Sequence, residues 1–132
     1  MKAQSVTPEL MVTDMDRTIY FYARELGFQL QAAEKDHGEV VWAQIELAEN
    51  RLISFKEARK LKTELPLFDG VPIGGTFTLC IQIESVLAFK ASLPDSVPIV
   101  EKLHKTSCQL NQFSIKDPDG YILTFIDIGK TE

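Results

Sequence analysis

The chain has 132 residues and a mass of 14.9 kDa, a length that suits one domain. Hydrophobic residues make up 45% and charged residues 25% of it, as in a globular protein rather than a disordered one. The net charge of −5 argues against nucleic acid and anionic membrane partners, which attract basic faces. No stretch approaches the roughly 20 apolar residues of a membrane span, and the N-terminus has no apolar signal region, so we expect a cytoplasmic location.

The first half of the sequence predicts a strand, a helix and three further strands. Alternation over Val6–Val12 indicates the first strand, and Asp14 suits the N-cap of a helix. Apolar residues then recur at helical spacing, at Met15, Ile19, Tyr22 and Leu26. Gly27 is expected to end this helix in the left-handed conformation. Three apolar runs over 28–33, 39–47 and 51–57 indicate strands, separated by hairpin turns at 36–38 and 48–50.

Residues 58–75 have a different composition, with basic residues, two prolines and three glycines, and predict a mobile connector. The second half then repeats the first. It predicts a strand over 76–83, a short helix from Ser85, and strands over 97–103, 108–116 and 121–128. The last two strands flank Asp117-Pro118-Asp119-Gly120, which is a strong turn signal.

The two halves agree in register, because Val12-Thr13-Asp14 matches Ile83-Glu84-Ser85 at an offset of 71. We therefore predict an α+β fold built by duplication of a βαβββ module, with modules at about 1–57 and 76–130 in one domain. Set edge to edge, the modules would form one curved eight-stranded mixed sheet with helices on its outer face. Its concave inner trough would be a natural small-molecule site.

Two segments of the chain resemble the vicinal oxygen chelate superfamily, which includes glyoxalase I, extradiol dioxygenases, and fosfomycin- and bleomycin-resistance proteins. Residues 7–28, from Thr-Pro-Glu-Leu-Met-Val to Leu-Gly-Phe, look like its opening strand and helix. Residues 112–125, around Lys-Asp-Pro-Asp-Gly-Tyr, look like its closing hairpin. Pro-Leu-Phe-Asp-Gly in the connector is most similar to the bleomycin-resistance-like branch. The resemblance implies the fold above but not one activity, since the fold hosts enzymes and binders alike.

The resemblance also implies where a metal would bind. Metal-dependent members of the family carry one ligand on the first and one on the last strand of each module, usually His, Glu or Gln. Carried onto this sequence, those positions are Thr7, Ser54, Thr78 and Thr124. Neutral hydroxyls are poor ligands for a divalent ion, so we expect no metal and no cofactor. The alternative ligand set is Glu9, Gln44 and Gln112, which lacks histidine and repeat symmetry.

Strand parity surrounds these hydroxyls with further candidate ligand-binding residues. Glu9 would favour a cationic or donor group, unless it only faces water or a dimer partner. Trp42 could stack on an aromatic ligand, unless it only packs. The complete predicted site is Thr7, Glu9, Met11, Trp42, Gln44, Ser54, Thr78, Gln112, Ile122 and Thr124, with no catalytic residue. His37 and His104 are expected in solvated turns.

These observations favour a metal-free binding protein of the glyoxalase/bleomycin-resistance type, which holds a cationic or aromatic small molecule. The alternatives are a metal-dependent glyoxalase- or dioxygenase-like enzyme with atypical ligands, and a non-catalytic interaction or regulatory domain. Whether the chain is an enzyme stays open at this point. We also expect a homodimer, because single-chain members of the family usually pair and exposed strand edges need cover.

Overall fold

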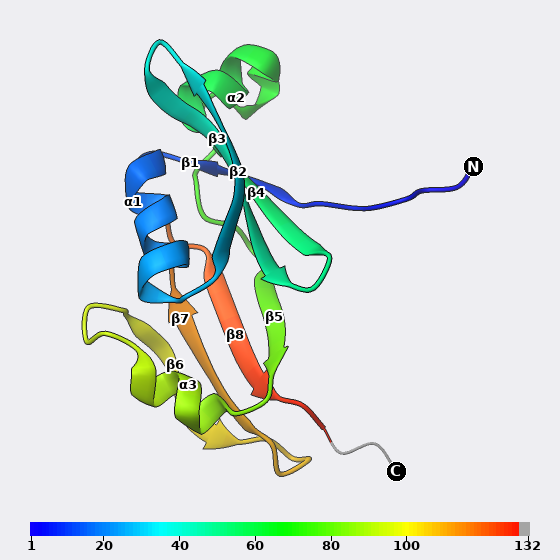
Figure 1. Ribbon diagram of the computed structural model, residues 1–132, viewed down its shortest axis with the longest axis vertical. Helices are drawn as coiled ribbons and strands as arrows, with labels where there is room; N and C mark the ends of the chain where they lie inside the picture. Colours follow the sequence, from blue (N-terminus) through cyan, green and yellow to red (C-terminus); the bar gives the residue numbers. More distant parts are fainter. Residues whose placement is uncertain (130–132) are drawn as a thin grey trace. The chain divides into compact units, whose positions relative to one another are not determined.

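The computed structural model describes residues 1–129 (Figure 1). The boundary between two compact units falls between Ile73 and Gly74. The first unit contains β1 (Glu9–Val12), α1 (Met15–Ile19), the π-helix η1 (Tyr20–Glu25), β2 (Gln29–Asp36), β3 (Glu39–Ala48), β4 (Arg51–Glu57), α2 (Ala58–Glu64) and the 3-10 helix η2 (Pro66–Phe68). The second contains β5 (Thr78–Ile83), α3 (Val86–Ser92), β6 (Ile99–Lys105), β7 (Asn111–Lys116) and β8 (Ile122–Asp127).

Each unit holds one four-stranded mixed sheet, and the two sheets have the same topology. The strand orders are β1-β4-β3-β2 and β5-β8-β7-β6, with the first strand of each module parallel to the last and all other pairs antiparallel. The α+β class and the duplicated βαβββ module are thereby confirmed. The strands form two separate sheets rather than the single eight-stranded sheet that we predicted. Side-chain alternation marks strands and faces, but it does not specify which edges exchange backbone hydrogen bonds.

The predicted N-cap at Asp14 is present, and Ser85 caps the predicted helix of the second module in the same way. The Asp14 carboxylate accepts a hydrogen bond from the Arg17 backbone N–H at 3.2 Å. The Ser85 hydroxyl accepts one from the Ala88 N–H at 3.1 Å. Each side chain satisfies an N–H group that has no partner within its own helix. Equivalent caps at an offset of 71 start the helix of each module just after its first strand.

The first helix changes from α to π geometry within the span that we predicted as a single helix. The Leu26 N–H donates to the Phe21 carbonyl at 2.9 Å, which is the wider i→i+5 pattern. The wider turn brings Phe21 into the core beside Tyr22, with ring centroids 5.2 Å apart. A regular helix with 3.6 residues per turn would not place Phe21 on the apolar face that the sequence predicted. Gly27 then ends the helix with φ at +84°, as predicted.

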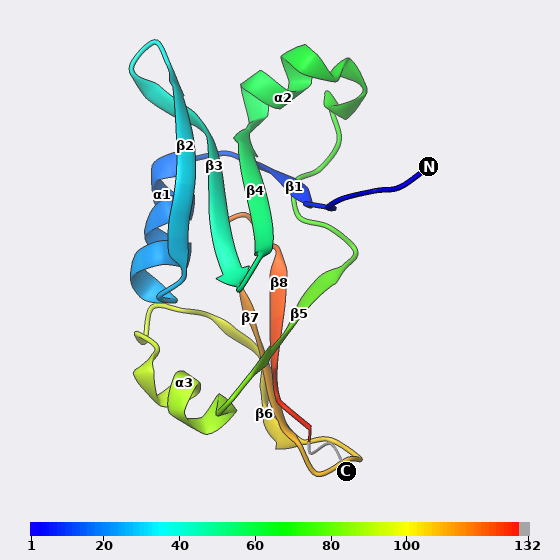
Figure 2. The same ribbon diagram turned by 45° about the vertical axis from the view of Figure 1, so that its right-hand side comes forward.

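Each sheet has one face covered by a helix. In the first module Tyr22 packs on Phe55 of β4, with ring centroids 4.7 Å apart, and α1 runs along this face (Figure 2). In the second module Phe89 of α3 packs on Phe125 of β8 at 4.5 Å, and Phe125 packs on Phe113 of β7 at 5.6 Å. The opposite face of each sheet carries the polar residues described below.

The predicted connector contains regular structure that we did not expect. Helix α2 begins after Glu57, whose carboxylate accepts from the Lys60 N–H at 3.1 Å, and it buries Leu61. Pro66 then starts η2. The prolines and glycines after residue 65 indicated a connector, but the preceding residues 58–64 include Ala, Leu, Lys and Arg, which favour helix.

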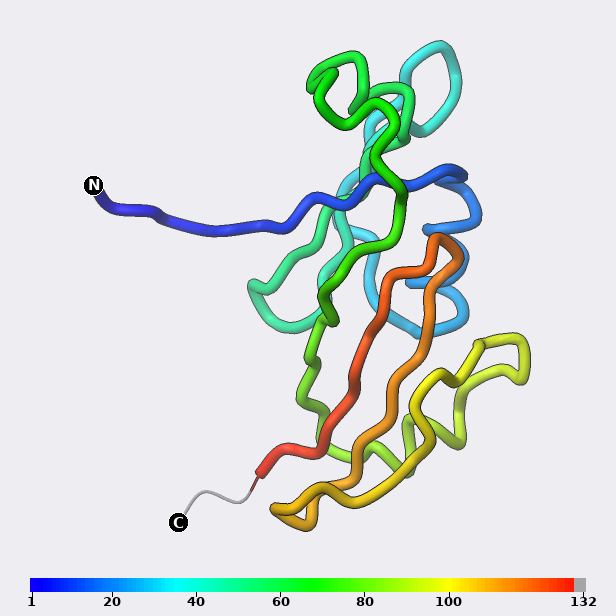
Figure 3. The backbone as a smooth tube through the Cα atoms, turned by 180° about the vertical axis from the view of Figure 1, so that it is seen from behind, coloured from blue at the N-terminus to red at the C-terminus, as the bar shows by residue number. Residues whose placement is uncertain are grey.

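The chain before β1, dark blue in Figure 3, has no regular secondary structure. The predicted strand over Val6–Val12 is therefore shorter, and Thr7 precedes it. Within residues 1–129, no helix is long and apolar enough to cross a membrane.

The Asp117–Gly120 turn depends on one buried carboxylate, and this gives a testable prediction. Asp117 Oδ1 accepts from the backbone N–H groups of Asp119 and Tyr121, each at 2.9 Å, while Gly120 has φ at +95°. Asp117→Ala leaves a buried N–H unsatisfied and should lower the free energy of unfolding by about 1–3 kcal/mol in urea titrations. Asp95→Ala, in an exposed turn, should change it by no more than about 0.5 kcal/mol. Equal effects of the two variants would contradict a structural role for Asp117.

Candidate ligand-binding faces

The face of the first sheet that α1 does not cover carries most of the predicted residues of this module. Residues paired across neighbouring strands share a face, and the register aligns Glu9, Ser54 and Gln44 in one row. The next row aligns Met11, Lys56 and Trp42. We call these six residues the first polar face. Thr7 is not among them, since it lies before β1 beside a cavity of about 510 Å³ that Asn50, Arg51 and Leu52 also line.

Charged groups fix the position of Trp42 on the first polar face. The indole Nε1–H donates to Glu9 Oε1 at 3.0 Å. Lys56 Nζ lies 3.7 Å from Glu9 Oε2 and 2.6 Å from Glu64 Oε1 on α2. The hydrogen bond to Glu64 raises the pKa of Lys56, and the negative charges of Glu9 and Glu64 raise it further. Burial lowers the pKa of Lys56, but by less than these interactions raise it. The positive charge of Lys56 therefore compensates part of the negative charge of Glu9 on this face.

The corresponding face of the second sheet, which we call the second polar face, is lined by hydroxyl, amide and carboxylate groups. It contains Thr78, Cys80, Glu101, His104, Gln112, Ser114, Ile122 and Thr124. All four predicted residues of this module, Thr78, Gln112, Ile122 and Thr124, therefore share one face.

A chain of short hydrogen bonds runs across the second polar face. Thr78 Oγ1 lies 2.7 Å from Thr124 Oγ1, which lies 2.8 Å from Ser114 Oγ. Ser114 Oγ in turn donates to Glu101 Oε1 at 2.8 Å. Gln112 Nε2 donates to the same carboxylate oxygen at 3.1 Å. The predicted residues Thr78, Thr124 and Gln112 are thus linked through Ser114, which shares the strand face of Gln112 in the sequence, and through Glu101, which was not predicted.

Glu101 and His104 were missed because β6 is irregular. The ladder between β6 and β7 shifts register between Ile99 and Glu101, and again between Glu101 and His104. Strict alternation from buried Val97 would turn Glu101 toward the core. The shifts instead bring Glu101 and His104 together, with His104 Nε2 3.2 Å from Glu101 Oε2. His104 is exposed, as expected, but it lies within β6 and not in a turn.

The hydrogen bonds to Glu101 lead to a prediction for acid conditions. Burial raises the pKa of Glu101. Hydrogen bonds from Gln112, Ser114 and His104 together lower it by more, so the pKa of Glu101 in the folded protein lies below its usual value. The resulting stabilisation is present above the unfolded pKa and is lost as the pH falls through the folded pKa. Glu101→Gln should therefore lose stability at pH 7 but differ less from wild type below about pH 4. Urea titrations at both pH values test this, with exposed Glu84→Gln as the control; a constant difference would contradict it.

The donors at the family's metal positions do not fit a divalent ion. Thr78 and Thr124 are hydrogen-bonded to each other, and Ser54, on the first polar face, is only 4% exposed. In the part of the chain that the structure describes, no group of three or more His, Cys, Asp or Glu side chains is placed to hold a metal. The alternative ligands are also engaged elsewhere, Glu9 with Trp42 and Gln112 with Glu101. The donor set instead suits hydrogen bonding to an organic molecule.

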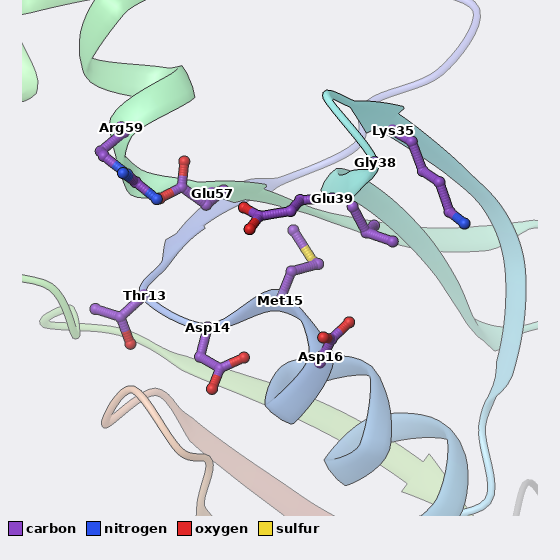
Figure 4. Close-up of a pocket in the computed structure, with 10 residues that line it drawn as sticks. Thr13, Asp14, Met15, Asp16, Lys35, Gly38, Glu39, Glu57 and Arg59 are labelled. Carbon is purple, nitrogen blue, oxygen red and sulfur yellow. The ribbon is translucent and has the colours of Figure 1, made fainter.

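A cavity of about 440 Å³ lies at the start of α1, away from the predicted site residues (Figure 4). Its walls include Asp14 and Asp16 of the helix end, and Glu39 of β3. Across from them, Arg59 Nε lies 3.3 Å from Glu57 Oε1. The charges of this cavity are therefore mixed, and it contains none of the residues on either polar face.

Comparisons with known proteins identify the family. The sequence model of the Glyoxalase/Bleomycin resistance protein/Dioxygenase superfamily matches residues 4–125. A search of curated protein sequences found no match. Among solved structures, a protein of unknown function from Agrobacterium tumefaciens str. C58 is 20% identical with a TM-score of 0.78, over 98% of this chain and 97% of that one.

Two further structures show the same fold. TioX from Micromonospora sp. ML1 is 19% identical with a TM-score of 0.72, over 95% of this chain and 98% of that one. TnmS3 from Streptomyces sp. CB03234, described as an antibiotic binding protein, is 20% identical with a TM-score of 0.66, over 98% of this chain and all of that one. With the family match over most of its length, the chain belongs to the Glyoxalase/Bleomycin resistance protein/Dioxygenase superfamily.

Proposed function

We propose that this protein binds a small organic molecule on its polar faces and does so without a metal ion. The observation that carries the proposal is the chemistry of the four positions where metal-dependent members of the family hold their ion. All four are neutral hydroxyls here, and Thr78 and Thr124 are hydrogen-bonded to each other. Such groups can bind the polar atoms of a ligand, but they cannot replace imidazoles and carboxylates around a divalent ion.

The composition of the first polar face supports an aromatic ligand, and that of the second polar face supports a ligand with polar substituents. The half-buried ring of Trp42, held by Glu9, offers a flat stacking surface on the first polar face. On the second polar face, half-buried Ile122 adds apolar area, while Thr78 and Gln112 supply directed hydrogen bonds. The fold shared with TnmS3, an antibiotic binding protein, is consistent with a binding role.

Trp42 is the only tryptophan of the chain, so its fluorescence reports on the first polar face directly. We would titrate the protein with metal-free bleomycin in the presence of EDTA. Bleomycin is chosen because the family description includes bleomycin resistance and because the molecule combines aromatic rings with a cationic tail. The proposal predicts a saturable change in Trp42 emission that EDTA does not alter. Metal-dependent turnover of a hemithioacetal or a catechol would overturn it in favour of an enzyme.

We further propose that the protein is a homodimer. All eight residues of the edge strand β2 are exposed, and an uncovered strand edge offers backbone hydrogen bonds to a second chain. Light scattering of the purified protein at micromolar concentration should give about twice the chain mass of 14.9 kDa. A mass equal to that of one chain would contradict the dimer.

A further inference from the structure

The hydroxyl chain on the second polar face has a fixed direction, and the direction follows from counting protons. Ionised Glu101 can only accept hydrogen bonds, so Ser114 gives its single hydroxyl proton to Glu101 Oε1, 2.8 Å away. Ser114 must then accept in its 2.8 Å contact with Thr124, which therefore donates. The pKa of Glu101 lies below its usual value, so the carboxylate is ionised at neutral pH.

The same count extends to the end of the chain at Thr78. The Thr124 hydroxyl already donates its single hydrogen bond to Ser114. The 2.7 Å hydrogen bond between Thr78 and Thr124 must therefore be donated by the Thr78 hydroxyl. The Thr78 hydroxyl also lies 3.3 Å from the Ile122 carbonyl oxygen. A single proton cannot fully serve both oxygens, and without it in the shorter contact two lone pairs would face each other at 2.7 Å. Thr78 is therefore a donor to Thr124.

Both ends of the chain are accessible to a ligand. Ser114 and Thr124 are 5% and 8% exposed, whereas Thr78 is exposed and the side chain of Glu101 is 38% exposed. Having donated inward, the Thr78 oxygen keeps only its lone pairs for solvent. The end of the chain at Thr78 therefore offers a neutral hydrogen-bond acceptor, while the end at Glu101 offers a carboxylate that Ser114, Gln112 and His104 already contact.

We infer that Glu101 orients the Ser114–Thr124–Thr78 chain so that Thr78 is a subsite for a hydrogen-bond donor of the ligand, such as a hydroxyl, an amide N–H or an ammonium group. This inference rests on the proposed function and adds a specificity to it. Glu101 is a positioning residue, because it acts through two buried hydroxyls, and Thr78 is the residue that contacts the ligand. A ligand that presents only an acceptor at this point would meet the lone pairs of Thr78.

Neutron diffraction from deuterated crystals tests the direction of the chain itself. The inference predicts deuterium on Ser114 Oγ pointing to Glu101, on Thr124 Oγ1 pointing to Ser114, and on Thr78 Oγ1 pointing to Thr124. Deuterium on Thr124 pointing to Thr78, or on Thr78 pointing only to the Ile122 carbonyl, would overturn it.

A matched pair of fragments tests the subsite in solution. Benzyl alcohol has a donor proton and benzyl methyl ether lacks it. Both would be titrated into protein with labelled threonine methyl groups, so that shifts of Thr78 and Thr124 report binding at this place. Benzyl alcohol should bind about threefold to tenfold more tightly, the value of one net hydrogen bond. Equal affinities, or no shift at Thr78 with either fragment, would overturn the inference.

Two variants separate positioning from simple support of the fold. Glu101→Leu frees the proton of Ser114, so the chain can reverse, and the preference for alcohol over ether should disappear while the ether gains affinity. Thr78→Val removes the acceptor at an exposed position and should abolish the preference while the protein stays folded. Thr63→Val, an exposed threonine on α2, is the control and should keep the wild-type preference. A preference that survives Thr78→Val would overturn the inference.

The outcomes are separable from those of the proposed function. A saturable response of Trp42 to bleomycin, combined with equal affinities for the two fragments, would overturn the donor subsite alone. A fragment preference at Thr78 supports the subsite whether or not bleomycin binds near Trp42.

Discussion

Replacing Phe125 with alanine is expected to lower the free energy of unfolding by about 3–5 kcal/mol, the usual loss for a large aromatic residue in a packed core. Phe125 is 0% exposed and contacts two other rings, those of Phe89 and Phe113, at 4.5 and 5.6 Å. Truncation leaves a cavity between α3 and the second sheet that these neighbours fill only in part. Urea titrations followed by circular dichroism measure the change.

Phe77→Ala is the matched control for this prediction. Phe77 is also aromatic and lies in the same unit, but it is 44% exposed, and its ring lies 5.9 Å from that of Tyr121, measured between the ring centroids. Its truncation should cost no more than about 1 kcal/mol. Similar losses for Phe77→Ala and Phe125→Ala would contradict the assignment of the core to the helix-covered face.

Replacing Trp42 with alanine should weaken the binding of metal-free bleomycin by about 2 kcal/mol or more, which is roughly thirtyfold. The reason is that the indole supplies the largest flat apolar surface of the first polar face and is already held in place by Glu9 at 3.0 Å. Because the variant lacks the fluorescent reporter, isothermal titration calorimetry is the measurement.

Tyr20→Ala provides the control for Trp42. Tyr20 is a 58% exposed aromatic residue of η1, outside both polar faces. Its replacement should leave the affinity for bleomycin unchanged. Equal losses for the two variants would show that the ligand contacts exposed aromatic residues without selection, and would contradict a site at Trp42.

Much of the fold could be predicted from the sequence because its signals are local. Asp14 and Ser85 cap their helices through bonds to residues three positions ahead, and Asp117 and Gly120 form their turn within a few residues. The offset of about 70 residues between the modules then repeats the same local pattern. Caps and turns of this kind depend only on residues a few positions apart, so they can be predicted without knowing how distant parts of the chain pack.

The features that escaped prediction depend on backbone irregularities or on distant pairing. The π turn that buries Phe21 and the register shifts that bring Glu101 to the polar face each break a regular period. Periodicity arguments assume that the period continues, so they place both residues on the wrong side. The division of the strands into two sheets depends on which edges pair, which side-chain alternation does not encode.

The candidate site shows the same contrast. Glu9 was predicted on the inward face of the first strand and Trp42 as a possible wall residue, and the structure joins them by a hydrogen bond. The compensation of Glu9 by Lys56 was not visible, because Lys56 is held by Glu64 from a helix in the segment read as a connector. Thr7 was assigned to the first strand by alternation, but β1 begins at Glu9. Residue identities therefore predicted which side chains share the polar faces better than they predicted where the strands begin.

The central claim is that this member of the family binds its ligand with hydroxyls and an aromatic ring in place of a metal. The most direct test compares the affinity for bleomycin of chelator-treated protein with that of protein first dialysed against zinc or nickel and then freed of unbound metal. We predict that the dialysed protein retains no stoichiometric metal and that the two affinities are equal. Stoichiometric metal, with binding that chelator treatment abolishes, would contradict the account.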